Sequence, residues 1–489
     1  MGPMAFLVAA SLAIAPPPGP SPAPSPAPSA APAVAAAAPA AERTYLADLD
    51  VPGGTLRFVL RLAESGDATI DIPAQGIDRM PLDVSGKPDG TMVMRLPVPV
   101  PAFMELKESG DRLEGTFRQG TFSSPIAFRA GSPAKPQDPV PPLPYATRDI
   151  EVRHPAGHVL AGTLVLPAGA SASARVPGVV FITGSGPQDR DESLMGHRPF
   201  LVLADALARR GIASVRCDDR GFGKSTGTFA DATSDDFASD ARAEFEWIAA
   251  VPEVDPARVG FVGHSEGGLV GPLAAASIER APGAKARPAF IVLLAGPGVD
   301  GAAILKEQNT AIFRAAGTQG EVLDAIVRTH AALVDAAVAG APDAELRALA
   351  EAAVDAQARA GGAAEAMAAG GGRAQVVEGV VGQMRAPWMV RFMRLDPAPA
   401  LRALRCPALA LFGERDLQVL PSQNEAPVAA ALREAGVPAT VRTMPGLNHL
   451  FQPARRGTLD EYATIDVTCD PAVLALVGGW ILAQPPRSR

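Results

Sequence analysis

The feature that most constrains the fold is a series of short apolar runs, separated by helix-like stretches, that begins after Thr147. The runs are nearly continuous in apolar residues, which is typical of strands buried on both faces of a sheet. Between two of them, Phe237, Ala241 and Phe245 recur at helical spacing. This alternation predicts a mostly parallel sheet with helices on both faces. The expected strands are 178–183, 212–217, 259–262, 289–294, 408–412 and 439–443, and the expected helices include 199–210 and 421–435.

A long block interrupts this alternation. Residues 300–400 are rich in Ala, favour helix and contain no strand candidate, so we expect a helical cap inserted at about these positions. Ahead of the first buried strand, residues 150–154 and 159–166 predict a hairpin. The α/β domain is expected to span 147–489.

The sequence before this domain has a different pattern. Residues 44–131 alternate apolar and polar positions, as Leu56, Phe58 and Leu60 show, which predicts a small antiparallel β-domain. Prolines are frequent between this segment and the α/β domain, so residues 132–146 are expected to form a stiff linker.

The first 43 residues resemble a leader. Residues 4–15 form an apolar run with the length of a signal-peptide core and too short to span a bilayer. A Pro/Ala-rich tether follows. We therefore expect a signal-like leader and tether over 1–43 and export to the periplasm or the medium. Because no Lys or Arg precedes the run, a low-complexity tail and a cytoplasmic location remain as alternatives.

Charge and cysteine content exclude several classes of protein. The net charge is −8 and no dense basic run occurs, so neither nucleic acid nor an anionic membrane surface is an expected partner. Cys217, Cys406 and Cys469 are odd in number and widely spaced, which favours neither a disulfide framework nor a metal cluster. The sequence says nothing about oligomeric state.

Two segments fit the pattern G-x-S-x-G, at residues 263–267 and 223–227. Ser265 directly follows an apolar strand and precedes a helix-like stretch. At such a turn the hydroxyl projects above the sheet, and small glycines permit the strained backbone. Ser225 follows a polar stretch and no strong helix succeeds it. Ser265 is therefore the candidate nucleophile, with a structural turn serine as the alternative.

A serine nucleophile needs a base to take its proton, and the chain has six histidines. His449 follows the last strand, and loops at the carboxyl ends of strands carry catalytic groups in α/β sheets. His264 adjoins the serine, but strand alternation should turn its ring away. The other histidines lie near the hairpin, at a helix start or in the cap; they are His154, His158, His197 and His330.

The histidine in turn needs an acid to fix its tautomer. Asp416 immediately follows the strand 408–412 and is our candidate, while Glu414 and Asp300 compete for the role. The order Ser265, Asp416, His449 is that of the α/β-hydrolases.

The tetrahedral intermediate requires N–H donors for its oxyanion. We expect one from the backbone of Glu266, the residue after the nucleophile, and one from Ser185 in the Gly-rich loop 184–187. Pairing of Asp189 and Arg190 is expected to orient this loop.

From about residue 150 onward the chain resembles an α/β-hydrolase. It is most similar to bacterial carboxylesterases with Gly-Ser-Gly-Pro-x-Asp-Arg (184–190), Asp-Asp-Arg-Gly-x-Gly-x-Ser (218–225), Gly-His-Ser-Glu-Gly-Gly (263–268) and Asn-His-Leu-Phe (448–451). The resemblance implies hydrolysis of short-chain carboxylic esters, a β-rich N-terminal domain and a helical cap. It implies no metal and no organic cofactor.

The sequence therefore predicts a serine carboxylesterase that acts on a small-molecule ester through an acyl-enzyme. An aminopeptidase-like serine peptidase would use the same residues, and a non-catalytic binding module is the other alternative. Five cap residues with apolar side chains either form the core of the cap, as is usual at helical spacing, or line the substrate pocket; they are Met384, Trp388, Met389, Phe392 and Met393.

Overall fold

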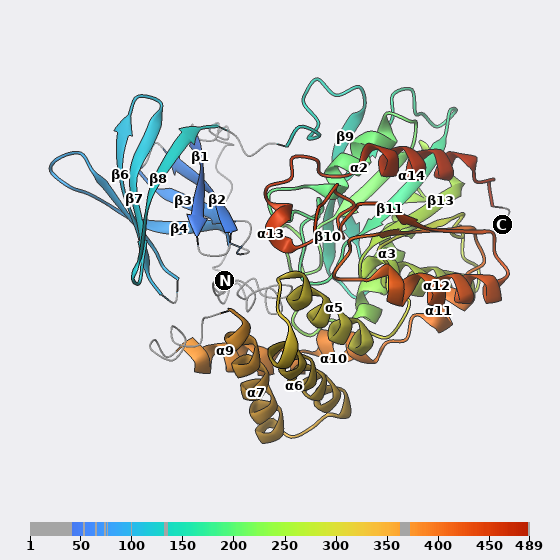
Figure 1. Cartoon of the computed structure of the whole chain (residues 1–489). Coiled ribbons are helices and arrows are strands. Elements are labelled where there is room, and N and C mark those ends of the chain that lie inside the picture. The colour runs from blue at the N-terminus through green and yellow to red at the C-terminus, as the bar shows by residue number, and fades with distance from the viewer. Residues whose placement is uncertain are drawn as a thin grey trace, which may run out of the picture. The chain divides into compact units, whose positions relative to one another are not determined.

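The computed structural model describes residues 42–51, 54–63, 66–72, 75, 77–98, 100–131, 135–361 and 372–487. The apolar run and the Pro/Ala-rich tether expected before the β-domain lie outside the described residues. The chain divides into two compact units on either side of residues 132–134, a β-unit and an α/β unit (Figure 1).

The β-unit is an antiparallel sheet closed into a barrel, in which β1 pairs with both β2 and β8. Its interior holds Phe58, Phe117 and Phe128, whose rings meet edge-on at 5.6 and 6.5 Å. The small antiparallel β-domain predicted from period-two alternation is confirmed, and its closure leaves no free sheet edge. The strands are β1 (Glu42–Val51), β2 (Gly54–Ala63), β3 (Ala68–Ile72), β4 (Ile77–Gly86), β5 (Met92–Leu96), β6 (Ala102–Ser109), β7 (Arg112–Gln119) and β8 (Phe122–Ala130).

The α/β unit contains an eight-stranded sheet in the order β16-β15-β14-β13-β11-β12-β10-β9. Strands β11 to β16 pair in parallel, and the hairpin β9–β10 joins them antiparallel through β12. The predicted strands and the hairpin are all present, but β16 is an edge strand and is only partly buried. The strands are β9 (Ala146–Arg153), β10 (Val159–Leu166), β11 (Val176–Ile182), β12 (Ala213–Cys217), β13 (Val254–His264), β14 (Ile291–Leu294), β15 (Ala408–Gly413) and β16 (Ala439–Met444).

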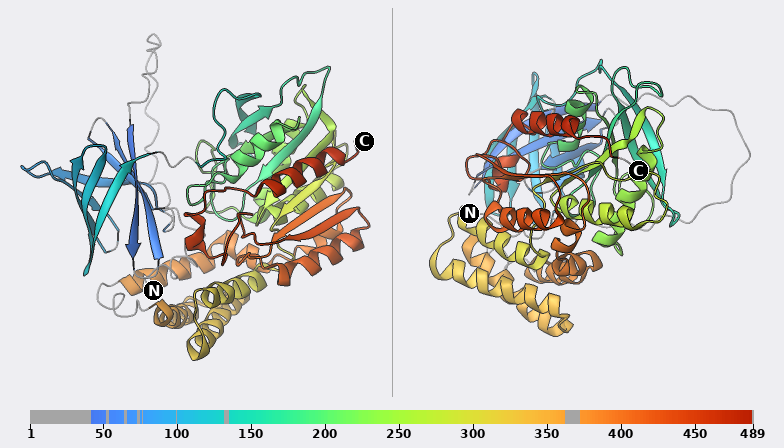
Figure 2. Two further views of the ribbon diagram at one scale, coloured as in Figure 1. Left: turned by 45° about the horizontal axis from the view of Figure 1, so that its top comes forward. Right: turned by 90° about the vertical axis from the view of Figure 1, so that its right-hand side faces the viewer.

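Helices cover both faces of this sheet (Figures 1 and 2). Helices α2 (Pro199–Ala208) and α14 (Pro471–Ala483) pack together on one face, where they share a core with β11, β14 and β15. Helices α3 (Ser234–Ile248), α4 (Gly267–Arg280) and α12 (Pro421–Ala435) cover the other face. The predicted α/β-hydrolase fold is thereby confirmed. A short helix, α13 (Leu459–Tyr462), precedes α14.

The helical cap enters between β14 and β15, as expected, and its helices gather beside one end of the sheet (Figure 2). Helix α10 packs against α5 and also reaches α3 of the α/β core. Among the described residues, no helix has both the length and the apolar character needed to cross a membrane. The cap helices are α5 (Gly301–Ala315), α6 (Gly320–Ala339), α7 (Asp343–Gly361), α9 (Gly372–Arg385) and α10 (Pro387–Arg394), and the following α11 (Ala398–Arg402) packs against α4 and α12 of the core.

Candidate active site

Ser265 occupies a sharp turn between β13, which ends at His264, and α4, which begins at Gly267. Its φ is +53°, a left-handed conformation that is costly for a serine. The Ser265 N–H donates to the Leu294 carbonyl over 2.8 Å, which holds the turn against β14. The structure therefore gives Ser265 the backbone expected of a nucleophile elbow.

Two glycines make this turn sterically feasible. A Cβ on Gly263 would lie 2.0 Å from the Gly267 carbonyl oxygen, and a Cβ on Gly267 would lie 2.2 Å from that of Ile182. The start of α4 thus packs directly on the backbone of β13 and β11, and no larger residue fits at either position.

His449 and Asp416 meet in the loops that follow β16 and β15. The Nδ1 of His449 lies 2.7 Å from Oδ2 of Asp416, and both side chains are buried. The other Asp416 oxygen accepts the backbone N–H groups of Gln418 and Val419 at 2.7 and 2.9 Å. The carboxylate is thus held on both sides, and bonding at Nδ1 leaves Nε2 of His449 to exchange a proton.

The two competing acids have other partners. Glu414 accepts the N–H of Gly446 at 2.6 Å, and Asp300 caps α5 by accepting from Ala303 at 2.9 Å. Of the three candidates, the geometry favours Asp416 as the partner of His449.

The expected oxyanion donors flank the nucleophile. Ser185 follows β11, and together with Ser265 and Glu266 it lines a cavity beneath the cap. Within the part of the chain that the structure describes, the backbone N–H groups of Ser185 and Glu266 donate to no other protein group. Both N–H groups are thus uncommitted beside Ser265, as an oxyanion site requires.

The side chain of Glu266 has a role that the sequence did not suggest. Its carboxyl group is buried and accepts from the Ser185 hydroxyl at 2.9 Å, the Ser234 hydroxyl at 2.7 Å and the Trp388 indole at 2.9 Å. Burial raises the pKa of Glu266. Because Trp388 belongs to α10, one carboxyl group links the oxyanion loop, α3 and the cap.

His264 does not line the cavity that contains Ser265, and its ring centroid lies 4.7 Å from that of His449. One ring nitrogen donates to the His449 carbonyl at 3.0 Å, and the other lies 2.8 Å from the Glu192 carboxylate. Glu192 also accepts the N–H of Gly184 at 2.8 Å. Burial disfavours a charged ring, but Glu192 outweighs it and raises the pKa of His264. This pair joins the oxyanion loop to the loop that carries His449.

The expected pairing of Asp189 with Arg190 is wrong. Arg190 instead makes two hydrogen bonds of 2.9 Å to Asp218, and Asp189 accepts the backbone N–H groups of Asp191 and Ser193. Asp189 and Arg190 thus have different partners: Asp189 bonds backbone groups within its own loop, and Arg190 bonds the segment after β12.

The second G-x-S-x-G segment is structural. The Ser225 hydroxyl donates to the Asp218 carbonyl at 2.7 Å and accepts the N–H of Ala161 at 2.8 Å. It thus pins the segment after β12 to β10.

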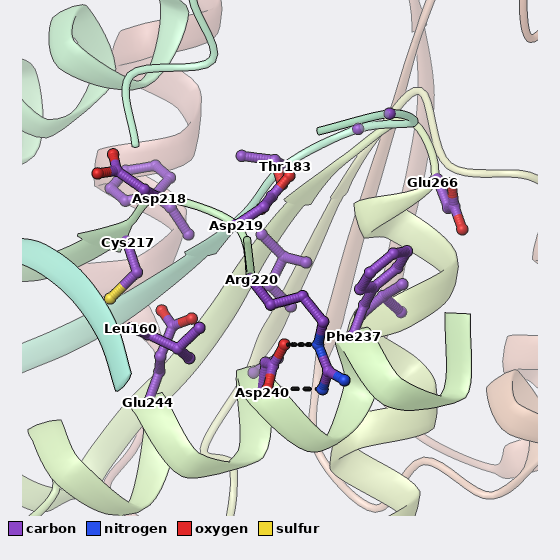
Figure 3. A pocket seen from close by; sticks show the side chains of 16 residues that line it. Leu160, Thr183, Cys217, Asp218, Asp219, Arg220, Phe237, Asp240, Glu244 and Glu266 are labelled. Atoms are coloured by element: carbon purple, nitrogen blue, oxygen red, sulfur yellow. Dashed lines mark hydrogen bonds and ion pairs between the residues drawn. The ribbon is translucent and has the colours of Figure 1, made fainter. Parts of the chain in front are cut away.

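Next to this segment lies a small acidic cavity of about 40 Å³, lined by Asp219, Glu244 and one side of Glu266 (Figure 3). Burial raises the pKa values of Asp219 and Glu244 well above the usual carboxyl range. Arg220 reaches across to Asp240 with hydrogen bonds of 2.6 and 2.8 Å (Figure 3). The Asp-Asp-Arg segment therefore builds the support beneath the oxyanion loop.

Among the described residues, one group has the composition of a metal site: His154, His158 and Asp240. The Nδ1 of His154 accepts the N–H of Ala156 at 3.0 Å, so the neutral ring carries its proton on Nε2, which donates to the Ser239 hydroxyl at 2.9 Å and lies 3.7 Å from Asp240. A protonated nitrogen cannot bind a metal, and Asp240 is already paired with Arg220. The group fits an ion-pair cluster better than a metal centre.

The cavity that contains Ser265 has a volume of about 70 Å³ and is roofed by the cap. Of the five apolar cap residues expected to line it, four do. Met393 does not line it. The four lining residues are Met384, Trp388, Met389 and Phe392.

No curated protein matches the sequence. Among solved structures, an esterase of Pyrococcus furiosus superimposes with a TM-score of 0.41 at 14% identity, covering 70% of this chain and 92% of the esterase. Est1E of Butyrivibrio proteoclasticus, solved with ferulic acid, gives 0.38 at 16% identity and coverages of 68% and 98%. A dienelactone hydrolase of Anabaena variabilis gives 0.37 at 16% identity and coverages of 70% and 99%.

Residues 156–423, more than half of the chain, match the family described as X-Pro dipeptidyl-peptidase (S15 family). The matched segment starts just before β10, contains the cap and ends within α12, so it includes Ser265 and Asp416. The protein is a serine hydrolase of the α/β type, and it belongs to the X-Pro dipeptidyl-peptidase (S15) family.

Proposed function

We propose that the protein hydrolyses carboxylic esters with short acyl chains. The observation that carries the proposal is the combination of a serine at φ +53° on the elbow after β13 with a buried His449–Asp416 pair at the same edge of the sheet. Two uncommitted N–H groups and an apolar cavity adjoin the serine, which suits an acyl group more than a charged substrate.

In the proposed reaction, Nε2 of His449 takes the proton of the Ser265 hydroxyl as its oxygen attacks the acyl carbon. Asp416 stabilises the imidazolium, and the N–H groups of Ser185 and Glu266 bind the oxyanion. His449 then protonates the departing alcohol. Water, deprotonated by the same nitrogen, then attacks the acyl-enzyme; the bond between the acyl carbon and the Ser265 oxygen breaks, His449 returns the proton to this oxygen, and the acid is released.

Replacement of the nucleophile tests this reaction. Ser265→Ala should lower the turnover of 4-nitrophenyl butyrate by about 10⁴–10⁶-fold, because no other group can form the acyl-enzyme. Ser225→Ala is the matched control, since it removes the serine of the other G-x-S-x-G segment, and it should retain most of the activity. The assignment of Ser265 is refuted if Ser265→Ala keeps more than a tenth of the native rate.

Peptide hydrolysis is the second candidate function, because the matched family is described as a dipeptidyl-peptidase family. The same serine, histidine and acid would cleave an amide, so the fold does not decide between them. Two substrates separate ester hydrolysis from peptide hydrolysis: a 4-nitrophenyl ester and an Ala-Pro 4-nitroanilide. For each one, kcat/KM is measured with the native enzyme and the value for Ser265→Ala is subtracted. Appreciable turnover of the anilide, with little of the ester, would overturn the proposal in favour of a peptidase.

A further inference from the structure

The cavity beside Ser265 is mainly apolar, but one face of α5 brings polar side chains to it. Residues of successive turns of α5 line the cavity: Ile304 and Leu305, then Gln308 and Asn309, then Ile312 and Phe313. The middle turn is therefore the polar part of an otherwise apolar wall.

Asn309 is the unusual member of this wall. Its side chain is 4% exposed, and within the described residues neither its amide oxygen nor its amide nitrogen has a hydrogen-bond partner. Leaving a buried amide unsatisfied is costly, so such groups are rare in folded proteins. Thr310, the next residue, shows the normal situation, since its buried hydroxyl donates to the Lys306 carbonyl at 2.9 Å.

His330 adds a second polar atom to the same cavity. Its Nε2 donates to the Leu305 carbonyl at 3.2 Å, so the neutral ring presents Nδ1 as an acceptor. Burial lowers the pKa of His330 to about 4, which keeps the ring neutral at physiological pH. Asn309 and His330 are thus two uncharged polar side chains in the wall of this cavity.

A ligand that forms hydrogen bonds with Asn309 and His330 meets uncharged groups in an otherwise apolar wall. We therefore expect a neutral, mostly apolar ligand with a hydrogen-bonding group at one point of its length. Ser265, Ser185 and Glu266 line the same cavity, and their N–H groups are the proposed binding site of the acyl oxygen. In the proposed ester hydrolysis, the acyl chain extends from this carbonyl into the cavity.

We propose that the preferred substrate carries a hydrogen-bonding group, an amide or a hydroxyl, on its acyl chain, and that Asn309 recognises this group. This inference rests on the proposed ester hydrolysis and adds a substrate class to it. Asn309 is a specificity-determining residue in this scheme and takes no part in bond cleavage.

Two pairs of isosteric esters test the proposal. The first pair is 4-nitrophenyl N-acetylglycinate and 4-methylpentanoate, and the second is 4-nitrophenyl 3-hydroxybutyrate and 3-methylbutyrate. The measured quantity is the ratio of kcat/KM for the polar ester to that for the apolar ester. Asn309→Leu should lower this ratio by about tenfold or more in at least one pair, and the pair affected identifies an amide or a hydroxyl. Each ratio is compared between the native enzyme and the variant, so differences in intrinsic reactivity between the two esters of a pair cancel.

Thr310→Val is the matched control, because it removes a neighbouring buried polar group that already has a partner. It should leave both ratios unchanged. The melting temperature gives a second readout: Asn309→Leu should melt no lower than the native protein, because it removes an unsatisfied amide. The proposal is overturned if both ratios stay within twofold of native in Asn309→Leu. If Ser265-dependent hydrolysis of all four esters is absent, the proposed function itself fails.

Discussion

His197 allows a quantitative test of how the α/β unit is held together. The imidazole is fully buried between the start of α2 and the segment around α13, where Nε2 donates to the Tyr462 carbonyl at 2.8 Å. Nδ1 lies 2.9 Å from the Thr468 hydroxyl, which donates to it in the neutral ring. Burial, reinforced by Lys135, lowers the pKa of His197 to about 4, against 6.5 for a free histidine.

This lowered pKa fixes the sign and the size of the effect. The native protein holds the ring neutral, while the unfolded chain binds a proton below pH 6.5, so the contribution to stability is fully present above 6.5. It is lost as the pH falls from 6.5 to 4. At about 1.4 kcal/mol per pKa unit, the loss by pH 4 is about 3 kcal/mol. The variant His197→Gln keeps a donor for Tyr462 and does not titrate.

The assay is urea unfolding followed by tryptophan fluorescence between pH 7 and pH 4. Trp247, Trp388 and Trp480 all lie in the α/β unit, so the signal reports this unit and not the barrel. Between pH 7 and pH 4 the unfolding free energy of both proteins falls. The fall should be about 3 kcal/mol smaller for His197→Gln than for the native protein, because the variant lacks the titrating ring. Thr468→Ser keeps both the histidine and the hydroxyl that bonds Nδ1, so it should keep the native pH dependence. If plots of unfolding free energy against pH run parallel for the native protein and His197→Gln, the reasoning is refuted.

Two further predictions concern the candidate site. Asp416→Asn should lower kcat for an aryl ester by about 10⁴-fold, since an amide cannot hold His449 in the required tautomer, and a loss of less than tenfold would contradict the assignment. Glu192→Gln should destabilise the protein most at low pH. Because the pKa of His264 is raised in the folded protein, the stability that the Glu192–His264 ion pair contributes is complete below pH 6.5 and is lost as the pH rises through the folded pKa of His264. Urea unfolding across pH 6–10 should therefore show the difference from native shrinking, and a constant difference would rule out this ion pair.

The sheet and the ends of its strands could be predicted from the sequence for one physical reason. Parallel strands buried on both faces have to be continuously apolar, so their limits are marked where polar residues begin. Ser265, Asp416 and His449 are all just beyond such limits, and topology brings the ends of these strands to one edge. This rule brings the candidate acids near His449, but only the observed hydrogen bonds distinguish Asp416 from Glu414 and Asp300.

Contacts of polar side chains within loops could not be predicted in this way. Residues 189–193 contain five polar residues in succession, and the sequence does not distinguish Glu192, which binds Gly184 and His264, from its neighbours. The mistaken pairing of Asp189 with Arg190 has the same origin, because the partner Asp218 is distant in sequence. Closure of the β-barrel likewise depends on pairing of the first strand with the last, which alternation within each strand does not encode.

Glu266 shows why the cap belongs to the catalytic geometry as well as to the substrate pocket. Its N–H is a proposed oxyanion donor, and its carboxyl group binds both Ser185, which carries the other proposed donor, and Trp388 of the cap. The carboxyl group is buried, so these hydrogen bonds are shielded from water and hold their partners firmly. A displacement of α10 would therefore act on the positions of both oxyanion donors. The insertion that supplies selectivity through Asn309 is thus mechanically connected to the groups that stabilise the transition state.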